Sequence, residues 1–240
     1  MNATNSTKFS PQTYARIGGV IYLIIIIAGL FAEIFVRSKL VVSGDPAATA
    51  TNIMSSQLLW RVGICADLIM QVCDIPLMMI FYVLLRPINK NLALLNLLFN
   101  VIQTAVLATN KLNLLMPLFL AGDADYLKAF DPQQLHALGY LFIKLHDHGL
   151  GVGLIFFGFV CLLEGHLIFK SGYFPKTLGV LMRLAGACYL INSFALLLSP
   201  KLAGTLFPFI LLPCLIAELL LALWMIIKGV NISEWEKKVG

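Results

Sequence analysis

Residues 14–37 read YARIGGVIYLIIIIAGLFAEIFVR, with no charged side chain between Arg16 and Glu33. A helix that rises ~1.5 Å per residue crosses the ~30 Å hydrocarbon core of a bilayer over this length. The whole chain has the same character, because 60% of its 240 residues are hydrophobic and 12% are charged. Average soluble proteins are about 25% charged. This stretch therefore predicts a membrane-spanning helix, and the composition predicts an integral membrane protein.

Five further apolar runs follow the first. Lipid offers the backbone no hydrogen-bond partner, so each run must satisfy its own backbone groups as a helix. We predict an all-α bundle with a loose polar N-terminus at residues 1–13, one membrane domain over residues 14–229 and a cytoplasmic tail at residues 230–240. The six spans are expected at about residues 14–37, 58–85, 91–121, 133–169, 175–198 and 206–228.

Basic residues flank the predicted spans unequally. One side carries Lys8, Arg16, Arg86, Lys90, Lys170, Lys176, Lys228, Lys237 and Lys238. The opposite side carries Arg37, Lys39, Lys128 and Lys201. The positive-inside rule therefore predicts that both termini are cytoplasmic and that the protein lies in the cell membrane.

The net charge of +5 does not indicate a nucleic-acid partner, because the basic residues are spread over short loops and form no cluster. The expected partner is the lipid bilayer, with a small molecule or ion as a ligand. The five cysteines fall within apolar runs and lack Cys-x-x-Cys spacing, so they indicate neither a metal site nor a disulfide framework. The sequence leaves the oligomeric state open.

Polar side chains inside the spans are the strongest indicators of function, because a charge at bilayer depth costs at least ~2.5 kcal/mol. Asp67, Gln71 and Asp74 are spaced i, i+4, i+7, which places them on one stripe of a helix. Side chains from at least four other spans are expected at similar depths. We predict one polar site in the outer half of the bundle, formed by Glu33, Asp67, Gln71, Asp74, Lys111, Asn113, His146, Asp147 and Glu218.

Acidic groups outnumber basic groups in this set, so the site is expected to bind protons, a cation or a cationic ligand. We predict a transporter or sensor in which Asp67 and Asp74 carry the negative charge. His146 is a candidate proton relay, because the ordinary pKa of imidazole is ~6.5. In a structural alternative, Lys111 and Lys144 pair with the acids and hold the helices together.

A second alternative is a metal-dependent hydrolase within the membrane. His146 with Asp67 or Asp74 is a candidate site for zinc or another divalent metal, which would activate water. His146 and His148 are two residues apart and point to opposite faces of a helix, so they are not expected to share one ion. The chain contains no Gly-x-Ser-x-Gly, His-Glu-x-x-His or phosphate-loop motif. The sequence therefore favours a binding protein over an enzyme and commits to no cofactor.

Some residues near the predicted span ends have simpler interpretations. Glu164 and His166 are expected to be solvated at the membrane surface. Aromatic residues such as Trp60, Tyr22, Tyr173 and Tyr189 are expected to form interfacial belts. The glycines within the helices are expected to form close-packed faces, including Gly18, Gly19, Gly149, Gly151, Gly153, Gly158, Gly179 and Gly186.

Several short patterns together resemble those of a known family. They are Gly29-Leu-Phe-Ala-Glu33, Gly63-x-x-Ala-Asp67, Leu85-Arg-Pro-x-Asn89, Asp125-Tyr-Leu, Leu145-His146, Phe156-Phe-Gly158, Ser171-Gly172, Glu218 and Lys228-Gly229. From about Arg16 to Val230 the chain resembles a family of bacterial multi-pass membrane proteins catalogued only as a domain of unknown function. The resemblance implies that Glu33, Asp67, Asp74, His146 and Glu218 are characteristic positions. It implies no reaction or substrate, and it does not extend to Lys111, Lys144 or His148.

Overall fold

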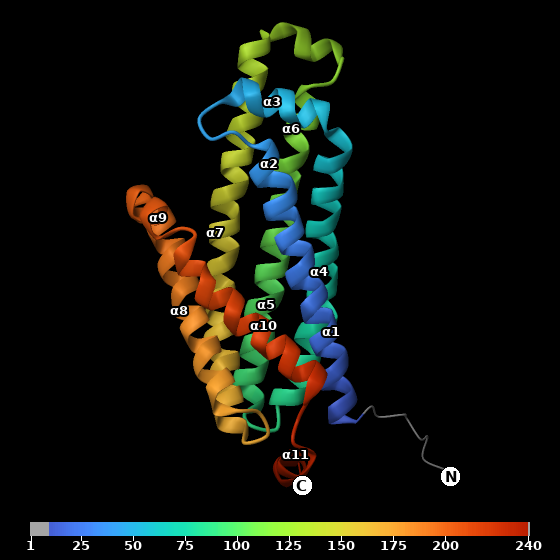
Figure 1. The fold of residues 1–240 in the computed structure, drawn as a ribbon, viewed down its shortest axis with the longest axis vertical. Helices are drawn as coiled ribbons and strands as arrows, with labels where there is room; N and C mark the ends of the chain where they lie inside the picture. The colour runs from blue at the N-terminus through green and yellow to red at the C-terminus, as the bar shows by residue number, and fades with distance from the viewer. Residues whose placement is uncertain (1–9, 240) are drawn as a thin grey trace, which may run out of the picture.

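Residues 10–239 are described in a computed structural model, and throughout that range the regular elements are helices (Figure 1). Six helical segments are long and apolar enough to cross a membrane. They are Pro11–Leu40, Gln57–Leu85, Lys90–Leu120, Pro132–Ser171, Lys176–Leu198 and Phe209–Ile227. The prediction of an all-α, six-helix membrane fold is confirmed. Lys8, one of the residues used to predict the orientation, lies outside the described residues.

Two spans each consist of three consecutive helical segments. The first comprises α1 (Pro11–Leu30), the π-helical segment η1 (Phe31–Arg37) and α2 (Ser38–Leu40). The third comprises α5 (Lys90–Asn110), the 3-10 segment η2 (Lys111–Leu115) and α6 (Met116–Leu120).

The second, fourth and fifth spans are the single helices α4 (Gln57–Leu85), α7 (Pro132–Ser171) and α8 (Lys176–Leu198). The sixth joins η4 (Phe209–Leu211) to α10 (Leu212–Ile227). Shorter helices connect or follow the spans: α3 (Pro46–Ser55), η3 (Asp125–Ala129), α9 (Pro200–Leu206) and α11 (Ile232–Val239).

Local capping explains several helix ends. α1 begins at Pro11, earlier than the predicted start of the span, because the Ser10 side chain accepts a hydrogen bond from the Thr13 backbone N–H. Asp131 and Gln134 form a reciprocal capping box at the start of α7. Gly172 ends that helix with a φ of 79°, a left-handed conformation that favours glycine.

The six spans form a closed ring in the order α1, α4, α5, α7, α8 and α10, with α10 packed back against α1. The start of α1, the 86–89 turn, the 172–175 turn and α11 lie at one end of the bundle, which we call the terminal end (Figure 1). At the other end, the α3 end, α3 lies across α6 and α7 (Figure 1). Because α10 is short and α9 lies at mid-height (Figure 1), the ring is complete only in the half nearer the terminal end.

Glycines allow α7 and α8 to approach closely, as the sequence predicts. A Cβ atom placed on Gly186 would lie 2.6 Å from the backbone oxygen of Gly158, and one on Gly179 would lie 2.7 Å from that of Gly165. Any side chain at these positions would push the two helices apart. The prediction of close-packed glycine faces is confirmed for this pair of helices.

Large apolar side chains cover much of the outer surface, including Ile27, Val72 and Ile216, as expected for helices in contact with lipid. The belt interpretation is wrong for Trp60, Tyr22 and Tyr173, which are buried. The Trp60 Nε1–H group donates to the Leu114 carbonyl at 2.8 Å, and the Tyr173 hydroxyl donates to the Leu84 carbonyl. Burial raises the pKa of the Tyr173 phenol, which stays neutral.

Candidate functional site

The polar stripe of α4, formed by Asp67, Gln71 and Asp74, is buried along its length. Its residues belong to two separate polar clusters of the bundle. Asp67 lies nearer the α3 end, and Gln71 and Asp74 lie toward the terminal end. Asp74 is about 16 Å from the end of α4 at Leu85, at ~1.5 Å per residue. The structure therefore divides the predicted residues between an ion-pair cluster around Asp67 and a cavity beside Asp74.

The ion-pair cluster consists of Glu33, Arg37, Asp67, Lys111 and His146. Arg37 donates from Nη1 and Nη2 to the two oxygens of Asp67 at 2.6 and 3.4 Å, and from Nε to Glu33 at 2.8 Å. Lys111 Nζ lies 3.3 Å from Asp67 and 3.1 Å from His146 Nε2. This chain of contacts joins η1, α4, η2 and α7, so it connects four elements of the bundle.

Two of the non-α helical segments, η1 and η2, contribute to this cluster. Arg37 is the last residue of the π-helical η1, and Lys111 is the first residue of the 3-10 segment η2. A change in residues per turn alters which side chains face inward. Arg37 and Lys111 consequently meet Asp67 from different helices, an encounter that a regular α-helical repeat does not predict.

The Lys111 ammonium constrains the chemistry of His146. An ammonium group only donates, so Nε2 accepts and the proton of the neutral ring is assigned to Nδ1. His146 Nδ1 lies 3.7 Å from Asp147, whose carboxylate pairs with Lys144 at 3.3 Å. The ammonium thus lies between Asp67 and His146, where the metal alternative requires an ion.

His146 and His148 point to different faces of α7, as the sequence predicts, and other polar side chains border the ion-pair cluster. His148 lies on the exposed face of α7, and its Nδ1–H group donates to the Lys144 carbonyl at 2.9 Å, away from buried His146. Asn113 donates to Asn110, which donates to the backbone oxygen of His146. Asn113 and Asp147 therefore border the ion-pair cluster, while the Glu33 side chain is 52% exposed at its outer edge.

A second polar group surrounds a cavity of about 150 Å³ at the centre of the helix ring, lined by residues of α1, α4, α5, α7, α8 and α10. Three carboxyl groups line it: Asp74 from α4, Glu164 from α7 and Glu218 from α10. All three side chains are buried. We call this space the central cavity.

Hydroxyl groups donate to two of the three carboxyls. Thr104 donates to Asp74 at 2.5 Å, and Tyr189 donates to Glu218 at 2.5 Å. No Lys, Arg or His occurs among the residues that line the central cavity. The acid groups therefore lack the basic partners that neutralise Asp67.

Several buried polar atoms of the central cavity have no hydrogen-bond partner. They are both amide atoms of Gln71, Oδ1 of Asn100 and Oε1 of Glu164. Gln71 is only 3% exposed, Asn100 5% and Glu164 4%. An unsatisfied buried polar group is costly, so atoms of this kind indicate where a ligand, ion or water would bind.

The sequence-based expectation for Glu164 is wrong. It is expected at the solvated membrane surface, but it is buried against the central cavity, and only its neighbour His166 is exposed. Glu164 is seven residues from the end of α7, but its side chain faces the interior of the ring, and distance from a helix end does not show which way a side chain faces. The sequence prediction also omits three residues that belong to these clusters: Arg37, Tyr22 and Tyr189. Only Arg37 carries a local signal, its i, i+4 spacing from Glu33.

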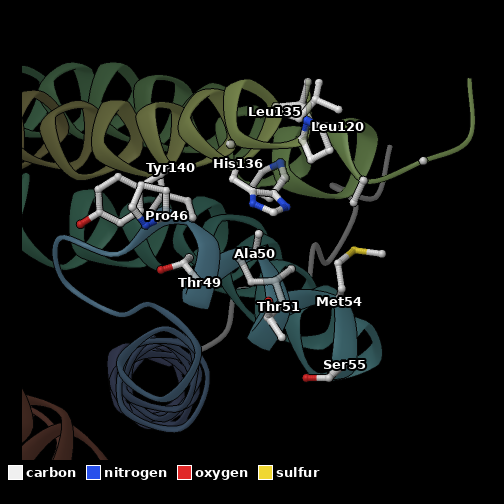
Figure 2. A pocket seen from close by; sticks show the side chains of 17 residues that line it. Pro46, Thr49, Ala50, Thr51, Met54, Ser55, Leu120, Leu135, His136 and Tyr140 are labelled. Carbon is white, nitrogen blue, oxygen red and sulfur yellow. The ribbon is translucent and has the colours of Figure 1, made fainter. Parts of the chain in front are cut away.

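A larger hollow of about 660 Å³ lies at the α3 end, between α3, α6 and α7. His136 and Tyr140 approach it from α7, opposite Thr49, Thr51 and Ser55 of α3 (Figure 2). The hydroxyls of these three α3 residues already donate to backbone carbonyls within the same segment. The central cavity is therefore the stronger candidate, because its polar atoms are buried and unpaired.

The six-helix ring with buried polar clusters defines a multi-pass α-helical membrane protein. Residues 17–229 match the model of a family described as Domain of unknown function (DUF4386), and the chain belongs to that family. An uncharacterized protein from Archaeoglobus fulgidus is 30% identical over 163 residues, which cover 68% of this chain and 81% of the relative. No solved structure matches the chain.

Proposed function

We propose that this protein binds a cation in the central cavity and acts as a membrane transporter or sensor for it. The observation that carries the proposal is the group of three buried carboxyls, Asp74, Glu164 and Glu218, in a cavity without a basic side chain. Three ionised carboxylates in so small a space repel one another and are poorly solvated. Protons, a bound cation or both must balance them.

The ion-pair cluster supports a structural function alongside the binding function. Asp67 contacts the buried Lys111 ammonium and the partly buried Arg37 guanidinium, so its charge is balanced within the protein. This cluster connects α4 to η1, η2 and α7 and stabilises the part of the bundle where α10 is missing from the ring. The structural alternative therefore describes Asp67, and the binding proposal rests on Asp74 and Glu218.

Metal-dependent hydrolysis has less support. A metal shared by Asp67 and His146 would have to displace the Lys111 ammonium, which lies within 3.3 Å of both side chains. Asp74 lies in the central cavity, and no histidine is among the residues that line it, so Asp74 and His146 do not share one site.

We also propose that the protein lies in the cell membrane with the terminal end in the cytoplasm. Arg86, Lys90, Lys170 and Lys176 flank the turns at that end, as the positive-inside rule requires. A fluorescent protein fused after residue 240 should then fold and fluoresce, and an alkaline phosphatase at the same position should be inactive. The reverse result would contradict this orientation.

Equilibrium dialysis of detergent-purified protein tests the cation proposal. The probes are radiolabelled sodium, rubidium and cyclohexylammonium, each measured with wild-type protein and with Asp74→Asn, Glu218→Gln and the double variant. We expect saturable binding of at least one probe at about one ion per chain, and a loss of about tenfold or more in affinity in the variants, because a charged partner is removed.

Asp125→Asn is the matched control, because Asp125 is 93% exposed and pairs with Lys128 far from the cavity. Size-exclusion chromatography and circular dichroism establish that each variant is folded. The two single substitutions each leave one acid in place, so binding can be measured even where the double variant does not fold. If none of the three probes binds wild-type protein above the Asp74→Asn background, the cation proposal is wrong.

A further inference from the structure

The walls of the central cavity are more apolar than a site for a bare ion requires. Nine of its 17 lining residues are aliphatic, Met or Phe, among them Ile25, Met70, Leu150, Leu154 and Phe157. Because these five side chains line the cavity, they are available to contact a ligand. Apolar walls with a few convergent polar groups are typical of sites for small organic molecules.

Two aromatic pairs face the same space. Tyr22 and Phe81 meet edge to face with ring centroids 6.2 Å apart, and Phe157 and Tyr189 do so at 5.2 Å. All four residues line the central cavity. Aromatic ring faces attract cations, most strongly where water is excluded. The same walls therefore offer apolar contact and favourable electrostatics to an organic cation.

Hydrogen-bond acceptors converge from three helices. The unpartnered oxygens Gln71 Oε1, Asn100 Oδ1 and Glu164 Oε1 come from α4, α5 and α7 respectively. An ammonium N–H group donates to oxygens of this kind and needs no acceptor in return. The carboxyls of Asp74 and Glu218 supply the opposite charge from α4 and α10.

The volume limits the size of the ligand. An engineered protein cavity of about 150 Å³ holds a benzene molecule, and the central cavity has the same volume of about 150 Å³. We therefore propose that the ligand is a small organic ammonium ion with an apolar body about the size of a six-membered ring. This inference rests on the proposed cation-binding function and names the chemical class of the cation.

Competition dialysis with three unlabelled compounds tests this class. Radiolabelled cyclohexylammonium is the probe, and its amine is charged at pH 7, as alkylamines with a pKa of ~10 are. The competitors are unlabelled cyclohexylammonium, the neutral isostere cyclohexanol, and sodium chloride. At about ten times its Kd, unlabelled cyclohexylammonium should reduce bound probe about tenfold. Cyclohexanol and sodium should reduce it less than about twofold at the same concentration.

A variant that changes the ring but keeps the apolar volume provides a second readout. Phe157→Leu should weaken cyclohexylammonium binding by about threefold or more, because it removes an aromatic face from the cavity. Phe159→Leu is the matched control, since Phe159 lies on the same helix, stacks on Phe99 and does not line the cavity. Equal affinities in these two variants would overturn the inferred aromatic contact.

The outcomes separate this inference from the proposed function. Sodium or rubidium binding without cyclohexylammonium binding would overturn the organic class and leave the cation site standing. Cyclohexanol competing as well as cyclohexylammonium would show an apolar pocket without charge recognition and overturn the inference. If no probe binds, both the inference and the proposed function are wrong.

Discussion

Replacing Asp67 by asparagine should destabilise the protein strongly. The substitution leaves Lys111, which is 4% exposed, without its carboxylate, and leaves Arg37 with only the exposed Glu33. Removing one partner of a buried ion pair costs about 3–5 kcal/mol because the remaining charge is uncompensated. Arg37 keeps Glu33 and Lys111 keeps the His146 nitrogen, so we expect about 3 kcal/mol, the lower end of this range.

The free energy of unfolding can be measured by titrating purified protein in mixed micelles with sodium dodecyl sulfate. A second variant, Asp67→Asn with Lys111→Met, removes one of the stranded charges and should recover about 1–2 kcal/mol. Asp125→Asn is the control and should not shift the unfolding midpoint, because its ion pair with Lys128 is exposed. A loss below about 0.5 kcal/mol for Asp67→Asn would refute this explanation of the cluster. It would also be refuted if the stability loss of the double variant equalled the sum of the losses of the Asp67→Asn and Lys111→Met single variants.

Three further substitutions give different expected outcomes in the same unfolding assay. Asp74→Asn should change stability by less than about 1 kcal/mol, because the carboxyl has no basic partner and an amide oxygen can still accept from Thr104; a loss near that of Asp67→Asn would mean that Asp74 holds the fold together. Gly186→Ala should cost about 1–3 kcal/mol, because its Cβ would collide with the Gly158 carbonyl, whereas Gly204→Ala meets no atom within 4 Å and should be neutral or stabilising; similar effects at the two sites would contradict the close packing of α7 on α8. Trp60→Phe should cost about 1–3 kcal/mol by leaving the buried Leu114 carbonyl unpaired, and unchanged stability would show that this hydrogen bond is dispensable.

The sequence predicts the helices well because lipid imposes a simple condition on each of them separately. A span must be apolar and long enough to cross the bilayer, and both properties can be read from neighbouring residues. The stripe of Asp67, Gln71 and Asp74 is also predicted correctly, because spacing along one helix determines which residues share a face. The cost of burying charge correctly directs attention to Lys111, His146 and Glu218, all of which are buried.

Which of these groups meet is determined by packing between helices. The π-helical and 3-10 segments bring Arg37 and Lys111 to Asp67, and no local pattern predicts that encounter. Because α10 closes the ring, Glu218 lines the same cavity as Glu164 and Asp74. The sequence by itself determined that polar groups lie inside the spans, because a polar residue within a long apolar run can be recognised from its neighbours in the chain. Only the tertiary structure decided which acid groups are neutralised, because that depends on contacts between residues far apart in the chain.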